Sequence, residues 1–150
     1  MPTIARNKRA NLDYEILDKW EAGIVLTGPE VKSAKLGHFN LKGSYISPRQ
    51  GNLFLINSRI APYQKAGQAQ KDYDPVRSRL LLVHKSELRK ISGKLRGRKS
   101  GLTLVPLSVY NKKGFIKIDF GIGKGRKKYD KREYIKKKEV ARRIRKALKR

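Results

Sequence analysis

The sequence predicts a mainly β fold with helices, of the α+β class, followed by a basic C-terminal tail. Several short segments alternate apolar and polar residues with the period of two that a half-buried strand requires. One long stretch before residue 128 has helical spacing, and a second such stretch lies at the C-terminus. Because 150 residues suit one compact domain, we predict a domain over 1–128 and a tail over 129–150.

The first part of the chain predicts an arm, a strand and a short helix. Residues 1–10 carry cations without an apolar period, so we expect a short, mobile basic arm there. An alternating pattern over 14–22 predicts a strand whose apolar face is interrupted by Asp18, which predicts a bulge or bend. That face carries Tyr14, Ile16, Trp20 and Ala22. After a turn at 27–29, residues 30–37 read as a brief helix that ends at a glycine.

The next segments predict a hairpin and a loop. Two strand candidates cover 40–47 and 52–60, and the Pro-Arg-Gln-Gly sequence at 48–51 between them predicts a hairpin turn. Residues 62–75 are polar and form a long connection. Long loops without regular structure are usually functional or disordered.

The remainder of the domain predicts one helix and two strands. Leucine and isoleucine recur at near-helical intervals over 76–95, which predicts the main helix of the domain. A second basic loop follows at 96–101. Residues 102–110 then form a largely apolar strand in which Pro106 predicts an edge or a bulge. The alternation over 115–122 predicts the last strand.

Several short strands and one long helix are typical of a compact β-barrel or a curved sheet capped by helices, and a small barrel of oligonucleotide-binding type is the nearest general form. The tail over 129–150 has an apolar stripe at helical spacing among many lysines and arginines. Like charges three and four residues apart destabilise an isolated helix. We therefore predict a tail that is disordered in the free protein and helical when a polyanion neutralises it.

The charge of the chain indicates the class of its partner. There are 38 basic and 12 acidic residues, a net charge of +26, and residues 121–150 hold +12 of it. So strong an imbalance favours a polyanion, and nucleic acid explains a basic body better than a membrane surface does. The sequence contains neither cysteine nor an apolar run of about 18 residues, which favours a cytoplasmic protein that does not span a membrane.

The sequence favours a binding protein over an enzyme. The chain has two histidines and no cysteine, so a zinc site is not expected. Acidic residues cluster over 13–21, but strand parity places Asp18 on the opposite face from the others. The G-x-G-x-G sequence at 121–125 matches neither nucleotide-binding glycine pattern. We therefore predict no catalytic site, no metal and no cofactor. A lone carboxylate can still accept hydrogen bonds from base amino groups.

The stretch from Gly121 to Arg132 combines glycines with crowded cations. Its glycines permit close approach of the backbone, and six lysines and arginines face one opposing carboxylate, Asp130. Tyr129 lies among these cations and is the aromatic residue that we expect to stack on a base. The alternative interpretation is a solvated basic linker.

Five motifs together resemble the SmpB family of SsrA-binding proteins, the bacterial partners of transfer-messenger RNA. They are N-K-R-A (7–10), E-A-G-I-V-L-T-G-P-E-V-K-S (21–33), D-P-V-R-S-R-L-L-L-V-H-K (74–85), T-L-V-P-L-S-V-Y (103–110) and G-K-G-R-K-K-Y-D-K-R (123–132). The resemblance implies an adaptor that binds the tRNA-like domain of transfer-messenger RNA and delivers it to stalled ribosomes for trans-translation. The tail would enter the decoding centre and the empty mRNA channel and fold there.

The resemblance also implies which residues serve each partner. The RNA-binding residues it implies are Asn7, Lys8, Arg9, Glu21, Lys32, Leu82, His84, Lys124, Arg126, Lys127 and Lys128. The residues it implies for the decoding centre and the mRNA channel are Tyr129, Asp130, Lys131, Arg132, Ile135 and Lys136. His84 stands where relatives often have Asn, Tyr129 where they often have His, and Leu80 where they tend to have a basic residue.

Two other interpretations remain at this point. A ribosomal or general structural RNA-binding protein would have the same charge but would assemble constitutively. A nuclease or another enzyme would need a converging acidic or histidine cluster, which the sequence does not present. We expect the adaptor to act as a monomer.

Overall fold

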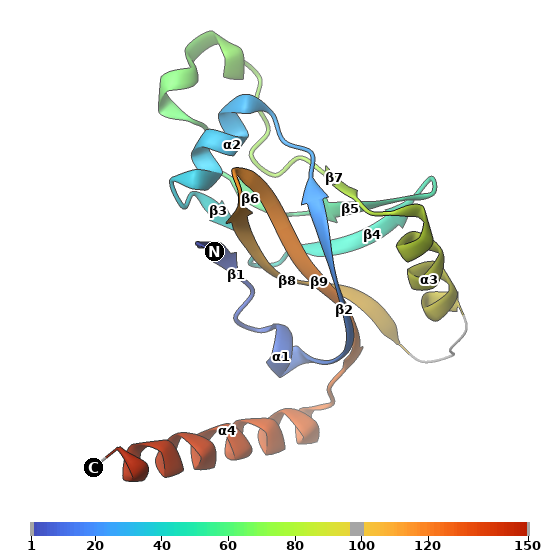
Figure 1. Ribbon diagram of the computed structural model, residues 1–150, viewed down its shortest axis with the longest axis vertical. Coiled ribbons are helices and arrows are strands. Elements are labelled where there is room, and N and C mark those ends of the chain that lie inside the picture. Colours follow the sequence, from blue (N-terminus) through green and yellow to red (C-terminus); the bar gives the residue numbers. More distant parts are fainter. Residues whose placement is uncertain (1, 97–100, 150) are drawn as a thin grey trace.

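A computed structural model describes residues 2–96 and 101–149, and its centre is one curved antiparallel sheet. In this described part, seven strands pair in the order β1-β8-β9-β2-β7-β5-β4 (Figure 1). They are β1 (Thr3–Arg6), β2 (Tyr14–Ile24), β4 (Tyr45–Arg49), β5 (Asn52–Ile56), β7 (Arg79–Leu82), β8 (Leu102–Lys112) and β9 (Phe115–Gly125). The strands β3 (Phe39–Asn40) and β6 (Arg59–Ile60) form a separate pair.

Helices lie around the sheet and at the C-terminal end of the chain (Figure 1). They are α1 (Ala10–Asp13), α2 (Gly28–Lys35), α3 (Lys85–Arg96), α4 (Lys128–Leu148) and the short 3-10 helix η1 (Gln64–Gln70). This confirms the mainly β, α+β class. The predicted closed barrel of oligonucleotide-binding type is not confirmed, because the edge strands β1 and β4 do not pair with each other in the described sheet.

The predicted strands agree best with the structure where their side chains alternate clearly. In β9, Ile116, Ile118, Phe120 and Ile122 are all buried, as the period of two predicts. The register of β2 shifts between Ile16 and Asp18, and that of β8 shifts around Pro106, so both predicted irregularities are confirmed.

The helix predicted over 76–95 is wrong in its first half. Residues Arg79–Leu82 form the strand β7, which pairs with β5 on one side and with β2 on the other. A short apolar run such as Leu80 to Val83 fits a strand or a helix equally well by spacing alone. Pairing with β5 and β2 makes this run a strand, and α3 begins only at Lys85. The basic loop predicted at 96–101 lies mostly outside the described residues.

The arm predicted over 1–10 is also corrected. Thr3–Arg6 pairs antiparallel with β8, and Asn7 extends this attachment because its backbone N–H donates to Leu107 O at 2.8 Å. The Asn7 side chain donates to Pro106 O, also at 2.8 Å, beside the bulge of β8. The arm is therefore an edge strand of the sheet.

The glycines of β9 are explained by packing. A Cβ atom on Gly121 would lie 2.5 Å from the backbone oxygen of Asp18, and one on Gly123 would lie 3.0 Å from the Tyr14 side chain. Side chains there would push β9 away from β2. The stretch predicted as one basic unit is thus divided, because Gly121 to Gly125 belongs to the sheet and Lys128 begins α4.

A buried ion pair attaches α2 to β7. Glu30 and Arg79 have side chains that are fully buried, with 2.7 Å between Glu30 Oε2 and Arg79 Nη2. Arg77 also donates to Glu30, and Tyr73 donates to the same carboxylate at 3.1 Å. Burial disfavours the carboxylate anion, but hydrogen bonds from Arg77, the Thr27 backbone and Arg79 outweigh it and lower the pKa of Glu30 to about 2.

Candidate nucleic-acid interface

The outward face of four neighbouring strands carries two of the predicted RNA-binding residues, Glu21 and Leu82. One register row runs from Leu82 on β7 through Gly23 on β2 and Lys117 on β9 to Tyr110 on β8. Glu21 lies two residues from Gly23 and so shares its face, opposite Asp119 of β9. We call the five residues Glu21, Gly23, Leu82, Tyr110 and Lys117 the sheet face.

Glu21 is held in place by hydrogen bonds. The Tyr110 hydroxyl donates to the Glu21 carboxylate, and it lies 2.9 Å from Asp119 Oδ1 as well. Lys112 Nζ is 3.3 Å from Glu21 Oε1. The hydrogen bond from Tyr110, helped by Lys112 and Lys117, outweighs partial burial and lowers the pKa of Glu21. Burial and the two carboxylates raise the pKa of Tyr110, so its hydroxyl stays protonated and remains a donor.

Since a phenol has one proton, Tyr110 can donate to only one of the two carboxylates at a time. The other carboxylate then keeps its acceptor oxygens available to a ligand. Both Glu21 and Lys112 have side chains that are more than one-third exposed to solvent. The arrangement can therefore accept hydrogen bonds from the amino groups of unpaired bases.

Leu82 and His84 are exposed at the end of β7. The Leu82 side chain is 59% exposed, so the strand turns it away from the core although a leucine favours burial. The backbone oxygen of His84 accepts from Leu88 N at 2.9 Å, which places His84 at the start of α3 with its side chain accessible. The RNA-binding role that the resemblance implies for Leu82 requires this exposure.

The other residues predicted to bind RNA are not brought to the sheet face as one group. Lys8 and Arg9 are exposed near α1, where Arg9 is 3.3 Å from Asp13 in an ion pair. Lys32 lies on α2 with its Nζ atom 5.7 Å from the centre of the Tyr63 ring. Asn7 is half-buried and holds the backbone of β8, so its visible role is structural.

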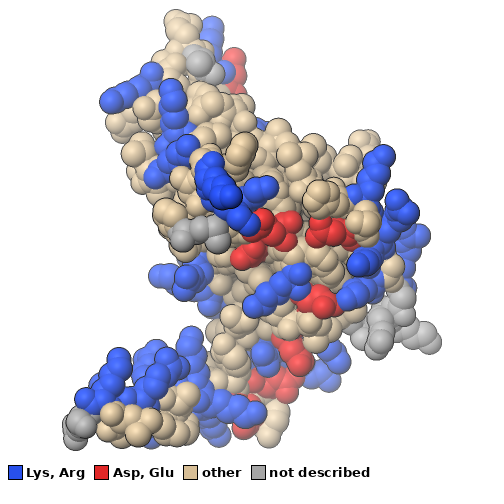
Figure 2. Space-filling model, viewed as in Figure 1, with Lys and Arg blue, Asp and Glu red and all other residues tan. Residues whose placement is uncertain are grey.

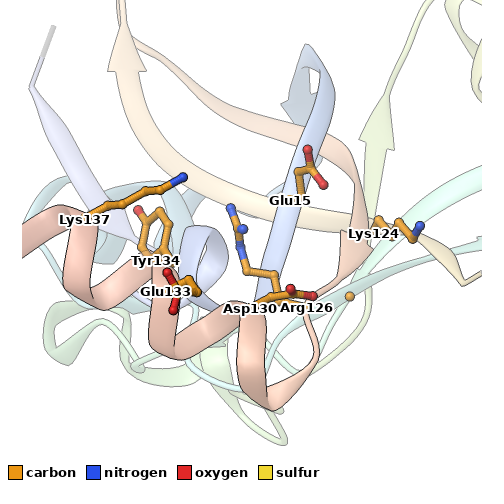
Figure 3. Close-up of a pocket in the computed structure, with 8 residues that line it drawn as sticks. Glu15, Lys124, Arg126, Asp130, Glu133, Tyr134 and Lys137 are labelled. Atoms are coloured by element: carbon orange, nitrogen blue, oxygen red, sulfur yellow. The ribbon is translucent and has the colours of Figure 1, made fainter.

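The connection from β9 to α4 surrounds a hollow of about 420 Å³ (Figure 3). The Arg126 guanidinium lies 4.7 Å from the centre of the Tyr134 ring, and Arg126 Nε donates to Asn11 O at 3.0 Å. Lys131 Nζ is 3.2 Å from Asp13 Oδ1. These contacts join the first turns of α4 to α1. Lys124 is exposed at the end of β9 and lines the same hollow.

Beyond these contacts α4 is exposed. None of the residues described in this helix is buried, and Tyr129 is 71% exposed. Asp130 accepts a hydrogen bond from the Lys127 backbone N–H at 3.3 Å and so caps the helix N-terminus. The remaining side chains predicted for RNA or ribosome contact in this region are also exposed, namely those of Lys127, Lys128, Arg132, Ile135 and Lys136. Figure 2 shows lysine and arginine along one side of α4 with an uncharged stripe beside them, whereas on the body acidic side chains lie among further lysines and arginines.

Three sets of residues have a role in the structure that was not predicted from the sequence. Tyr110 and Asp119 support Glu21, but their side chains meet it only through strand register. The Glu30–Arg79 pair joins elements far apart in the chain, and its single local signal was the Thr27–Glu30 spacing of a helix capping box. Phe115, at the hairpin between β8 and β9, is 70% exposed.

Residues 2–96 and 101–149 hold no cluster of three His, Cys, Asp or Glu side chains suited to a metal ion. The helices in this part of the chain include none that is both long and apolar enough to cross a membrane.

Comparison with known proteins gives a consistent result. The family model described as "SmpB protein" matches residues 4–150. The SsrA-binding protein of Sulfurihydrogenibium sp. is 49% identical over 146 residues, covering 97% of this chain and 93% of that protein. The SsrA-binding protein of Carboxydothermus hydrogenoformans is 48% identical over 145 residues, covering 97% and 95%. A solved structure described as "tmRNA-SmpB: a journey to the center of the bacterial ribosome" aligns with a TM-score of 0.65 and 43% identity, over 87% of this chain and 92% of that one.

Proposed function

The chain belongs to the SmpB family, and from this premise we propose that it is an RNA-binding adaptor of trans-translation. It binds the tRNA-like domain of transfer-messenger RNA and delivers that RNA to ribosomes stalled on broken messages. The solved relative is described as tmRNA-SmpB in the bacterial ribosome, which supports both partners. The protein acts in the cytoplasm as a monomer, without cofactor or catalytic step of its own.

The observation that carries this proposal is the presence of two separate regions suited to RNA. The sheet face offers a held carboxylate, an exposed leucine and Lys117, with Lys112 beside them, which suit unpaired bases and phosphates. The helix α4 offers mainly cations and no buried residue among those described, so its folding partner lies outside the chain. An adaptor between two RNAs needs two such regions, whereas a binder of one RNA needs one.

In this proposal the two regions have different tasks. The sheet face grips the tRNA-like domain, and the body replaces parts of a tRNA that this RNA lacks. The tail from residue 129 is disordered in the free protein and becomes helical in the decoding centre and mRNA channel, because ribosomal RNA neutralises its repelling charges. Tyr129 stacks on a ribosomal base, and the nearby cations contact phosphates.

Binding measurements test the first task. The affinity for the tRNA-like RNA should exceed that for a single strand and for a duplex of equal length, at one fixed salt concentration. Equal affinity for the three RNAs would overturn the proposal. Glu21→Gln should weaken the specific complex, whereas Asp72→Asn, which removes the same charge from an exposed loop, should not. Both variants should unfold at the temperature of the parent protein.

The second candidate, a structural ribosomal protein, predicts a different abundance. A constitutive component is present on nearly every ribosome. The adaptor should be substoichiometric and should increase on ribosomes when truncated messages accumulate, which quantitative analysis of purified ribosomes measures.

A further inference from the structure

The hairpin between β8 and β9 presents an aromatic side chain to solvent. Phe115 is 70% exposed, the highest fraction among the exposed large apolar residues described outside α4. The hairpin fixes its backbone, because Phe115 pairs with Lys112 across a two-residue turn. Lys113 and Gly114 in that turn both have positive φ, as tight hairpin turns require, and Gly114 N donates to Asn111 Oδ1 at 3.0 Å.

Phe115 lies on the same side of the sheet as the sheet face. Along β9 the buried residues Ile116 and Ile118 alternate with Phe115, Lys117 and Asp119, so these three point outward together. Lys117 is the register partner of Gly23, and Asp119 is the partner of Glu21. The exposed ring is thus continuous, through Lys117, with the residues proposed to bind RNA.

Gly23 leaves bare backbone in the middle of this surface. A Cβ atom built there would lie 3.6 Å from the Leu82 side chain and 3.8 Å from Lys117 Nζ. A larger side chain at position 23 would therefore occupy the space between Leu82 and Lys117. Two exposed apolar side chains therefore lie along this surface, Leu82 beside Gly23 and Phe115 at the hairpin.

We propose that Phe115 is a further RNA-binding residue, which stacks on an unpaired base of the RNA that the sheet face binds. An unstacked base offers a flat apolar surface to an aromatic ring, and the cations at Lys112, Lys113 and Lys117 attract the flanking phosphates. The net charge of +26 favours RNA over an apolar protein partner on this surface. This inference rests on the proposed function.

Substitutions at Phe115 test the stacking. Phe115→Ala and Phe115→Leu should each weaken binding of the tRNA-like RNA by about tenfold, because both remove the ring, whereas Phe115→Trp should retain affinity. The Phe115→Leu variant distinguishes stacking from simple apolar contact, because leucine keeps an apolar side chain but has no ring to stack on a base. Tyr45→Ala serves as the matched control, since Tyr45 is an exposed aromatic residue on the edge strand β4 and should leave affinity unchanged. Affinities of Phe115→Ala and Phe115→Leu within twofold of the parent would overturn the inference.

A fluorescence measurement gives a second readout, from the side chain at position 115 that is proposed to contact the base. Trp20 is the single tryptophan of the chain, so the double variant Trp20→Phe, Phe115→Trp carries one indole, at position 115. Saturating tRNA-like RNA should quench its emission, and a duplex should not. Unchanged emission while the RNA is fully bound would also overturn the inference. Failure of the parent protein to prefer the tRNA-like RNA would instead overturn the proposed function, so the two failures are distinguishable.

Discussion

The strand β9 and the helix α4 are consecutive and both carry an apolar stripe, yet they end in opposite environments. Phe120 in β9 is fully buried between neighbouring strands. Val140, Ile144 and Leu148 in α4 are between 53% and 79% exposed. A regular apolar period therefore predicts the type of an element, but it stabilises that element only where another surface covers it. The sheet has its partner within the chain, whereas the proposed function gives α4 its partner in the ribosome.

The largest expected effect comes from removing the tail, which should affect one function and leave the other. Deleting residues 130–150 should abolish peptide tagging on stalled ribosomes, because the tail is the part proposed to read the empty mRNA channel. Affinity for the tRNA-like RNA should remain within about tenfold at physiological salt, since only general phosphate attraction is lost. Tagging and binding assays on the same preparation measure both quantities. Loss of both together would mean that the tail is not a separable unit.

The next effect concerns the stability of the body. Arg79→Met leaves the buried Glu30 carboxylate with fewer partners, so the free energy of unfolding should fall by about 3–5 kcal/mol in urea titrations. The double variant Glu30→Gln, Arg79→Met should lose less than the two single variants added together. A loss below about 1 kcal/mol in the single variant would show that the pair does not hold α2 on β7.

Acid should weaken the body through the same pair. The pKa of Glu30 is about 2 in the folded protein and 4.5 in its ordinary state. A depressed folded pKa stabilises the protein above pH 4.5, and this contribution, about 3 kcal/mol, is lost as the pH falls from 4.5 toward 2. Unfolding measured across that window should show the decline, and Glu30→Gln should flatten it. An equal slope in the two proteins would assign the acid sensitivity to other carboxylates.

The smallest effect lies at the junction of the two regions. Arg126→Gln removes the guanidinium that stacks on Tyr134, and an exposed contact of this kind contributes about 0.5–1 kcal/mol. In the ribosome-bound protein, where α4 is proposed to be helical, hydrogen exchange of the first α4 amides should accelerate severalfold, while the unfolding temperature of the free body stays unchanged. Lys138→Gln, on an exposed part of α4, is the control and should leave those amides unaffected.

Sequence reasoning was most accurate where a pattern repeats along one element. The alternation of Ile116, Ile118 and Phe120 is a local property, and so is the break that Asp18 makes in β2. The chain motifs also indicated the family, which the comparisons confirm. The basic residues after Gly123 were found because charge is visible without structure.

The errors arose where distant segments decide the outcome. Leu80 and Leu81 fit a helix by spacing, but pairing with Phe54 and Leu53 of β5 makes them a strand. The N-terminal residues had no period of their own and became a strand by pairing with β8. Likewise, Tyr110 was visible in the sequence as an aromatic residue, but only register shows that its hydroxyl meets Glu21.

By itself the sequence determined the mainly β class, the large positive charge, the bulges and the family of this protein, because these follow from residue types and short periods. Tertiary structure alone decided that the sheet stays open, that Glu30 meets Arg79, and that Leu82 and Phe115 face solvent while Leu81 and Ile116 beside them are buried. The physical reason is that burial and pairing belong to two segments at once. A pattern within one segment specifies only half of such a contact.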